Sequence, residues 1–266
     1  YAPPLFNLAV LYYKKGDYAR SAFFWRRFLE IEPGRPEAYY GLGLTMKAVG
    51  DLPAALEAFT AASSLAPLDG RVFYELGLIY YELGRYELAV GAYTRAHELG
   101  FDEGRVAEGL GLSYTAWRRY DAAWPHLMRA AEKRGREGGT AFMVMGRIKR
   151  EQGEYGTALA NFFEAADRMS EPAAAYNEIG EIYLNEGLPS WAVEPLRRAT
   201  ASEPRSAKYA YNLALAYDRS TPRRAAAAWR RYLDLATGRS EEKDNIVFAQ
   251  RRVAELEAAY GLGEEE

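Results

Sequence analysis

A small residue recurs along the chain with a nearly constant period, and this period constrains the fold more than any other feature. It stands in the middle of seven leucine- and tyrosine-rich segments, at Ala9, Gly43, Gly77, Gly111, Gly146, Gly180 and Ala214. The steps between successive members are 34, 34, 34, 35, 34 and 34 residues. A fixed period of this length predicts a repeat architecture, in which each unit stacks on its neighbours.

Further columns follow the same period at helical spacings. A large apolar residue precedes the small one, and a second small residue follows it about twelve positions later. Four positions beyond that stands a large residue, at Trp25, Phe59, Tyr93, Leu127, Phe162 and Leu196. Spacings of three, four and seven residues are typical of α-helices. Glycine between the two helices of most units, as in KKGDY and ELGRY, favours the left-handed backbone that ends a helix. Each unit is therefore predicted to be a pair of helices.

These in-phase columns resemble the tetratricopeptide repeat family over most of the chain. The resemblance implies an all-α fold, a right-handed superhelical solenoid of seven helix-turn-helix tetratricopeptide repeats plus a C-terminal capping helix. The repeats are expected to fill residues 1–238, at about 2–35, 36–69, 70–103, 104–138, 139–172, 173–206 and 207–238.

The segment after the seventh repeat is expected to cap the array with one more helix, over residues 239–261. Ser240 is a candidate N-cap for it. One apolar stripe would face the array, formed by Ile246, Ala249, Val253, Leu256 and Tyr260. Residues 262–266 are expected to be a disordered tail.

The glycine column needs a physical reason, because glycine inside a helix costs about 1 kcal/mol relative to alanine. We expect Gly77 to face the second helix of its pair near Ala89, so that close helix packing offsets this cost. Gly84 is expected to form the turn between the two helices. Tyr80 is expected to lie in the core, and its neighbour Tyr81 on the binding surface.

Composition argues against several classes of function. The net charge is −3 and the arginine doublets are scattered, whereas a nucleic-acid binder concentrates basic residues on one face. The absence of cysteine removes disulfides, thiolate nucleophiles and cysteine zinc sites. The two histidines, His97 and His126, occupy different positions in their helices and do not form a metal-binding pattern. We therefore expect no enzyme, no cofactor and no metal, and no apolar run reaches the roughly 20 residues of a membrane span.

The resemblance also implies where a partner binds, because in this family the first helix of each pair lines a concave groove. Carried onto this sequence, the candidate partner-binding residues are Phe6, Val10, Tyr13, Tyr40, Leu44, Lys47, Tyr74, Leu78, Tyr81, Leu112, Arg147 and Arg150. These columns lie outside the expected core, and they are largely aromatic and aliphatic in repeats 1 to 3. In repeats 5 and 6 they become polar and charged, with Asn177, Glu178 and Glu181 beside the two arginines.

The predicted function is a non-catalytic protein–protein interaction scaffold. It would hold an apolar peptide or helix of a partner in the groove, mainly at repeats 1–4. Two alternatives stay open: a self-assembling scaffold that forms homo-oligomers, or the repeat region of a larger bacterial pilus or secretion assembly factor or of an enzyme. Because the sequence begins with Tyr1 rather than Met, we expect upstream sequence whose signal or anchor is not visible. The compartment is therefore unknown, cytoplasmic or periplasmic.

Overall fold

The computed structural model describes residues 3–261, and the regular elements among them are all helical. They comprise fifteen α-helices and two short 3₁₀ turns, with no strand in the described range. The helices fall into two compact units, unit 1 (Tyr1–Arg134) and unit 2 (Gly135–Glu266). The all-α fold expected from the sequence is confirmed, and each unit is described by itself.

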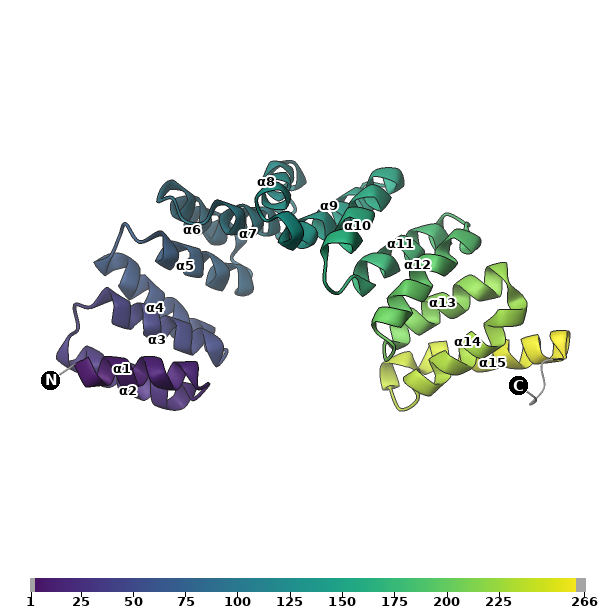
Figure 1. Cartoon of the computed structure of the whole chain (residues 1–266), viewed down its shortest axis with the longest axis horizontal. Coiled ribbons are helices and arrows are strands. Elements are labelled where there is room, and N and C mark those ends of the chain that lie inside the picture. Colours follow the sequence, from purple (N-terminus) through teal and green to yellow (C-terminus); the bar gives the residue numbers. More distant parts are fainter. Residues whose placement is uncertain (1–2, 262–266) are drawn as a thin grey trace. The chain divides into compact units, whose positions relative to one another are not determined.

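Unit 1 contains four helix pairs, each joined by a tight turn. Its helices are α1 (Pro3–Lys14), α2 (Tyr18–Ile31), α3 (Pro36–Ala48), α4 (Leu52–Leu65), α5 (Gly70–Glu82), α6 (Tyr86–Glu98), α7 (Glu103–Ala116) and α8 (Tyr120–Lys133). Each helix packs on the next one along the chain, and the first helices of neighbouring pairs also touch, α1 with α3 and α5 with α7 (Figure 1). One surface of unit 1 is therefore formed by first helices.

Unit 2 contains three helix pairs and a final single helix. Its elements are η1 (Gly135–Gly138), α9 (Gly139–Glu151), α10 (Tyr155–Arg168), α11 (Ala173–Asn185), α12 (Pro189–Ser202), α13 (Ala207–Ser220), α14 (Pro222–Ala236), η2 (Ser240–Glu242) and α15 (Lys243–Tyr260). Consecutive α-helices again pack on one another, and α11 also touches α13 (Figure 1). The exact boundaries of the seven repeats stay a prediction.

The regular spacing gave no hint of a division into two units, although one local signal exists. The single step of 35 residues falls between Gly111 and Gly146. The segment between α8 and α9 carries Gly135 and Gly138, and Gly139 is the first residue of α9. Glycine allows backbone conformations that other residues avoid, and Gly135 has a positive φ of 53°. An extra residue in a glycine-rich connection therefore coincides with the unit boundary.

Local sequence explains where the helices begin and end. Asp17 and Asp51 cap α2 and α4, and each side chain accepts a hydrogen bond from a backbone N–H of the first turn at 3.1 Å. Gly84 adopts a left-handed conformation (φ 71°) between α5 and α6, as expected. In the fourth pair Arg118 takes this role with φ 59°, a conformation that costs a non-glycine residue roughly 1 kcal/mol.

The core of each unit is built from the column of large residues on the second helices. Their side chains are at most 1% exposed: Phe59, Tyr93 and Leu127 in unit 1, and Phe162, Leu196 and Trp229 in unit 2. Burying a side chain of this size stabilises the fold by about 1.5–3 kcal/mol. The two units therefore rest on the same kind of core.

Close packing explains the glycine column. A Cβ on Gly77 would lie 2.7 Å from the ring of Tyr93, and one on Gly146 would lie 2.6 Å from the ring of Phe162. Real Cβ atoms do not approach other atoms this closely, so only glycine fits beside these rings. Gly77 does face the second helix of its pair, and the side chain nearest to it there is Tyr93, one turn beyond Ala89.

Some expectations about individual residues need correction. Tyr80 packs on the core but is only half-buried, and Tyr81 is also half-buried with its ring 5.7 Å from that of Tyr86. Ser240 does not cap the last helix, because it opens the 3₁₀ turn that precedes α15, and Glu242 occupies the N-cap.

The final helix otherwise presents the expected stripe. Ala249 and Leu256 are buried, Ile246 and Val253 pack against them, and Tyr260 is 44% exposed, so its expected burial is wrong. The tail predicted at 262–266 lies outside the described residues. None of the described helices combines the length and apolar character needed to cross a membrane.

Candidate functional site

A hollow of about 380 Å³ opens on the first-helix surface of unit 1, between α1, α3 and the start of α5. Five predicted partner-binding residues line it: Phe6, Val10, Tyr13, Tyr40 and Leu44. Its other lining residues are Lys14, Trp25, Pro36, Glu37, Gly41, Ala66, Asp69, Arg71 and Val72. The hollow is therefore mostly apolar, with charged side chains among its lining, and its volume lies in the range of ligand pockets.

Aromatic packing holds the walls of the hollow in place. The ring of Phe6 meets the indole of Trp25 edge-on, with centroids 4.9 Å apart at 90°. The ring of Tyr40 packs against the buried Phe59 at 5.7 Å. A Cβ on Gly41 would collide with the indole of Trp25, so glycine there leaves room for this ring. Rings fixed in this way form a rigid surface that needs little ordering when a ligand binds.

Two of the charged side chains that line the hollow, Asp69 and Arg71, form an ion pair with each other. Arg71 binds Asp69 through two hydrogen bonds, Nε to Oδ1 at 3.0 Å and Nη2 to Oδ2 at 2.7 Å, and its guanidinium lies 5.5 Å from the centre of the Tyr40 ring. The hydrogen bond from Arg71 holds the pKa of Asp69 below its ordinary value. Burial raises the pKa of Tyr40, and the charge of Glu75 raises it further. At neutral pH the hollow therefore presents a neutral phenol beside a compensated ion pair.

The other predicted residues of unit 1 lie outside the lining of this hollow. Tyr74 packs on Tyr93 at 5.7 Å and on Phe101 at 5.0 Å, and burial raises its pKa. Lys47 forms an ion pair with Glu75, which links α3 to α5. The remaining predicted residues, all partly buried, are Leu78 and Tyr81 on α5 and Leu112 on α7. We call the ten predicted residues from Phe6 to Leu112 the apolar face of unit 1.

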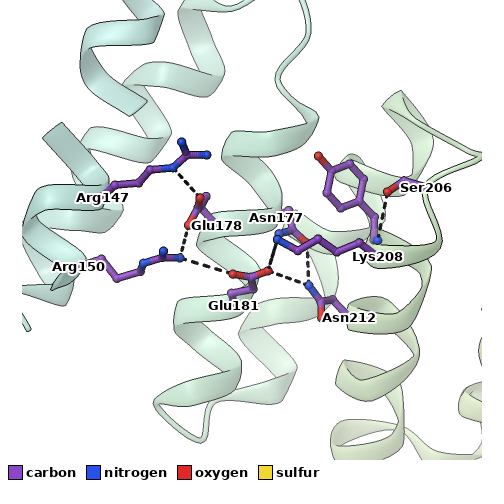
Figure 2. Close-up of polar contacts among 9 residues, drawn as sticks. Arg147, Arg150, Asn177, Glu178, Glu181, Ser206, Lys208 and Asn212 are labelled. Carbon is purple, nitrogen blue, oxygen red and sulfur yellow. Dashed lines mark hydrogen bonds and ion pairs between the residues drawn. The ribbon is translucent and has the colours of Figure 1, made fainter. Parts of the chain in front are cut away.

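The predicted residues of unit 2, Arg147 and Arg150, belong to a polar network. Figure 2 shows side chains of α9, α11 and α13 that point toward one another. The network comprises Arg147, Arg150, Asn177, Glu178, Glu181, Lys208 and Asn212. We call these seven residues the polar face of unit 2.

Two members of this network correct the expectation that these columns lie outside the core. Asn177 is 2% exposed and Glu178 is 7% exposed. Arg147 and Arg150 both bind the carboxylate of Glu178 and help to shield it from solvent. Met143, which belongs to the same column as Asn177, is also buried at 6%. First-helix positions in unit 2 therefore contribute to the packed interior as well as to the surface.

The two histidines line a second hollow of unit 1. His97 on α6 and His126 on α8 line one hollow of unit 1, together with Glu103 and Arg129. Burial lowers the pKa of His126, and the charge of His97 lowers it further. Across the part of the chain that the structure describes, no three His, Cys, Asp or Glu side chains gather in a way that could hold a metal ion.

Sequence reasoning missed several residues of the hollow. Trp25 belongs to the column of large residues on the second helices, and at 3% exposure it is buried, yet it also lines the hollow. Asp69, Arg71 and Val72 stand at the start of α5 and are not among the residues that were carried over from the family resemblance. Their contribution depends on how α5 packs beside α3, which no single repeat reveals.

Comparisons with known proteins agree with the helical pairs described above. Two tetratricopeptide repeat profiles match residues 5–34 and 47–103. Comparison with curated protein sequences gives no match. Among solved structures, a tetratricopeptide repeat protein from Parabacteroides merdae shares 17% identity over 94% of this chain and 98% of its own, with a TM-score of 0.68.

Two further structures share the fold at similar identity. PilF of Pseudomonas aeruginosa is 20% identical over 78% of this chain and 94% of its own, with a TM-score of 0.64. YrrB, a TPR protein with an unusual peptide-binding site, is 21% identical over 70% of this chain and 95% of its own, with a TM-score of 0.55. From the matching profiles, the shared fold and the helical pairs, the chain belongs to the tetratricopeptide repeat family.

Proposed function

We propose that this protein is a non-catalytic interaction scaffold that holds an apolar segment of a partner protein against the apolar face of unit 1. The observation that carries the proposal is the hollow of about 380 Å³ whose walls include Phe6, Val10, Tyr40 and Leu44. Proteins of this family generally act as scaffolds that bind protein or peptide partners. The proposal assigns that general role to one surface.

The chemistry of the hollow favours a large apolar side chain of the partner. Tyr40 and Phe6 offer ring faces, and Leu44 and Val10 offer aliphatic surface. A hollow open to water gains free energy when apolar surface fills it, at about 25 cal/mol per Å² of apolar area buried. The nearby ion pair between Asp69 and Arg71 is already satisfied, so a charged ligand would gain little from it.

Peptide display against the intact protein provides ligands for a direct test. The affinity of an enriched peptide is measured by fluorescence anisotropy for the native protein and for L44D and Y40A. We expect L44D to weaken binding at least about tenfold, because it places an unpaired carboxylate against the bound apolar side chain. Y40A is expected to weaken binding about tenfold through the loss of one aromatic wall.

A matched variant separates the hollow from a general effect of added charge. L88D adds the same charge at a leucine of α6 that is 50% exposed and does not line the hollow. It should leave the affinity unchanged, and circular dichroism should show that all three variants are folded. The proposal fails if folded L44D and Y40A retain native affinity, or if L88D weakens binding as much as L44D.

A further inference from the structure

The polar face of unit 2 carries more hydrogen-bond donors than its own acceptors use. In Figure 2 the carboxylate of Glu178 lies between Arg147 and Arg150 of α9. Arg147 donates from Nε to Oε1 of Glu178 at 2.9 Å, and Arg150 donates from Nη1 to Oε2. Both oxygens of this buried carboxylate are therefore occupied.

The second carboxylate, Glu181, is occupied as well. Its Oε1 accepts hydrogen bonds from Asn177 at 2.7 Å and from Asn212 at 3.1 Å, and it forms an ion pair with Lys208 at 2.9 Å. Its Oε2 lies 3.5 Å from Nη1 of Arg150. Burial alone would raise the pKa of Glu181, but these hydrogen bonds outweigh burial and hold the pKa below its ordinary value. Glu181 is thus charged at neutral pH, and both carboxylates of the network are already bound.

The donors, in contrast, are only partly used. Arg147 donates to the network through Nε, while its two Nη nitrogens extend away from Glu178 in Figure 2. The side chain of Arg147 is 52% exposed and that of Lys208 is 63% exposed. Arginine presents five N–H donors and lysine three. The spare donors of Arg147 and Lys208 therefore face solvent.

The charge count leads to the same conclusion. Within its seven residues the network holds three cations, Arg147, Arg150 and Lys208, and two carboxylates, Glu178 and Glu181, so one positive charge is left over among them. The carboxylate of Glu203, whose charge acts on Tyr209, lies outside this count. A surface with excess charge and spare donors attracts negatively charged acceptors.

The nearest further carboxylate along α13 does not compensate for this excess. Asp218 binds Arg252 of α15 with both oxygens, at 2.9 and 2.6 Å. This pair is therefore satisfied without the polar face.

We propose that the polar face of unit 2 binds the carboxylate side chains of an acidic segment of a partner protein, with Arg147 and Lys208 as the residues that contact it. The buried Glu178 fixes the guanidinium of Arg147 before a ligand arrives. Because arginine that is already ordered loses less conformational entropy on binding, this arrangement favours affinity.

Two exposed cations suit an acidic peptide better than a nucleic acid. A nucleic-acid backbone carries a regular series of phosphates and is held by many cations spread along a basic surface. On the polar face only Arg147 and Lys208 combine exposure above one half with spare donors, and the whole chain has a net charge of −3.

The inference stands apart from the proposed function, because it concerns other residues in the other unit. The probe is a short fluorescein-labelled peptide of alternating glutamate and glycine, and its counterpart carries glutamine in place of glutamate. Binding to the full chain is measured by fluorescence anisotropy at low ionic strength. We expect the glutamate peptide to bind and the glutamine peptide to bind at least about tenfold more weakly.

A charge-matched pair of variants locates the binding. The double variant R147A/K208A removes two positive charges from the polar face, and R223A/R224A removes two from exposed positions of α14. We expect the first to weaken binding of the glutamate peptide at least about tenfold and the second to change it less than about twofold. L44D should leave this binding unchanged, so a failure of the proposed function and a failure of this inference give different results.

Several outcomes would overturn the inference. The inference is wrong if the glutamate peptide does not bind the native chain. It is also wrong if the two double variants weaken binding of this peptide equally, because this would indicate a general effect of charge. The same holds if a single-stranded oligonucleotide binds more tightly than the peptide and depends on Arg147 and Lys208, because the ligand would then be a nucleic acid. Hydrogen exchange of α11 in R147A/K208A confirms that the variant keeps the fold.

Discussion

The two units share one building plan and differ in what their first helices present. In unit 1 the apolar face includes a hollow with Tyr40 and Leu44 among its walls. In unit 2 the corresponding columns hold the ion network around Glu178 and Glu181. Both units pack large residues of the second helices against glycine in the same register, as at Gly77 and Gly146. The core columns therefore determine the fold, and the first-helix columns are free to diverge in chemistry.

The difference also has an energetic side. Apolar walls that face water are in unfavourable contact with it, and a ligand that covers them removes this contact and so gains free energy. A buried carboxylate such as Glu178 must be compensated in the free protein, because an unpaired charge in the interior is strongly destabilising. The apolar face of unit 1 thus leaves apolar surface that a partner can bury. In the polar face of unit 2, in contrast, many polar groups already bind other groups of the protein.

The largest expected effect tests whether the two cores are equivalent and independent. F59A in unit 1 and F162A in unit 2 each remove a ring that is 0% exposed. Each should lower the free energy of unfolding of its own unit by about 3–5 kcal/mol, from lost burial and the cavity left behind. Hydrogen exchange resolved by peptide should show the loss in α3 and α4 for the first variant and in α10 and α11 for the second.

The same experiment measures how separate the units are. If F162A lowers protection in α3 and α4 as much as in α10 and α11, the units unfold together and the comparison must be made on the whole chain. A surface replacement such as Leu88→Ala serves as the control, since this side chain is 50% exposed and should cost little.

A smaller effect is expected from removal of the central carboxylate of the polar face. E178A leaves Arg147 and Arg150 without their shared partner. Because these two side chains are 52% and 33% exposed and can turn to solvent, we expect unit 2 to lose about 2 kcal/mol, less than the full cost of breaking a buried pair. Hydrogen exchange in α11, compared with α5, measures the loss.

A conservative variant separates charge from shape. E178Q keeps the size of the side chain and one acceptor oxygen but lacks the charge, so it should lie between E178A and the native protein. If E178A costs nothing, the network behaves as a set of solvated surface pairs, and unit 2 does not need its buried carboxylate.

The fold was accessible from the sequence because its determinants are local and repeated. The column of Gly43, Gly77 and Gly111 and the column of Phe59 and Tyr93 meet across the two helices of one pair, so their spacing alone specifies the contact. The division into two units was not accessible in this way. It depends on a glycine-rich connection near Gly135, where one additional residue has no counterpart in the other repeats.

The candidate site was accessible in part. Phe6, Tyr40 and Leu44 follow from the first-helix columns and do line one hollow. Asp69 and Arg71 were not carried over from these columns, and the packing of α5 beside α3 brings them to the hollow. The burial of Glu178 was missed for the same reason: its compensation by Arg147 joins residues 31 positions apart, on different pairs.

The smallest expected effect concerns pH and again separates the polar face from the apolar face. Burial alone would raise the pKa of Glu181, but hydrogen bonds from Lys208 and Asn177 hold that pKa below its ordinary value. A carboxylate whose pKa is lower in the folded state contributes stability above its unfolded pKa of about 4.5, and this contribution is lost as pH falls through the folded pKa. We therefore expect the urea midpoint of the native chain to fall more steeply below about pH 4.5 than that of E181Q, which cannot ionise at this position. E186Q, at the exposed C-cap of the same helix, should follow the native curve. If E181Q also follows it, the hydrogen bonds to Glu181 do not stabilise the folded state, and the polar face of unit 2 is no more sensitive to acid than the apolar face of unit 1.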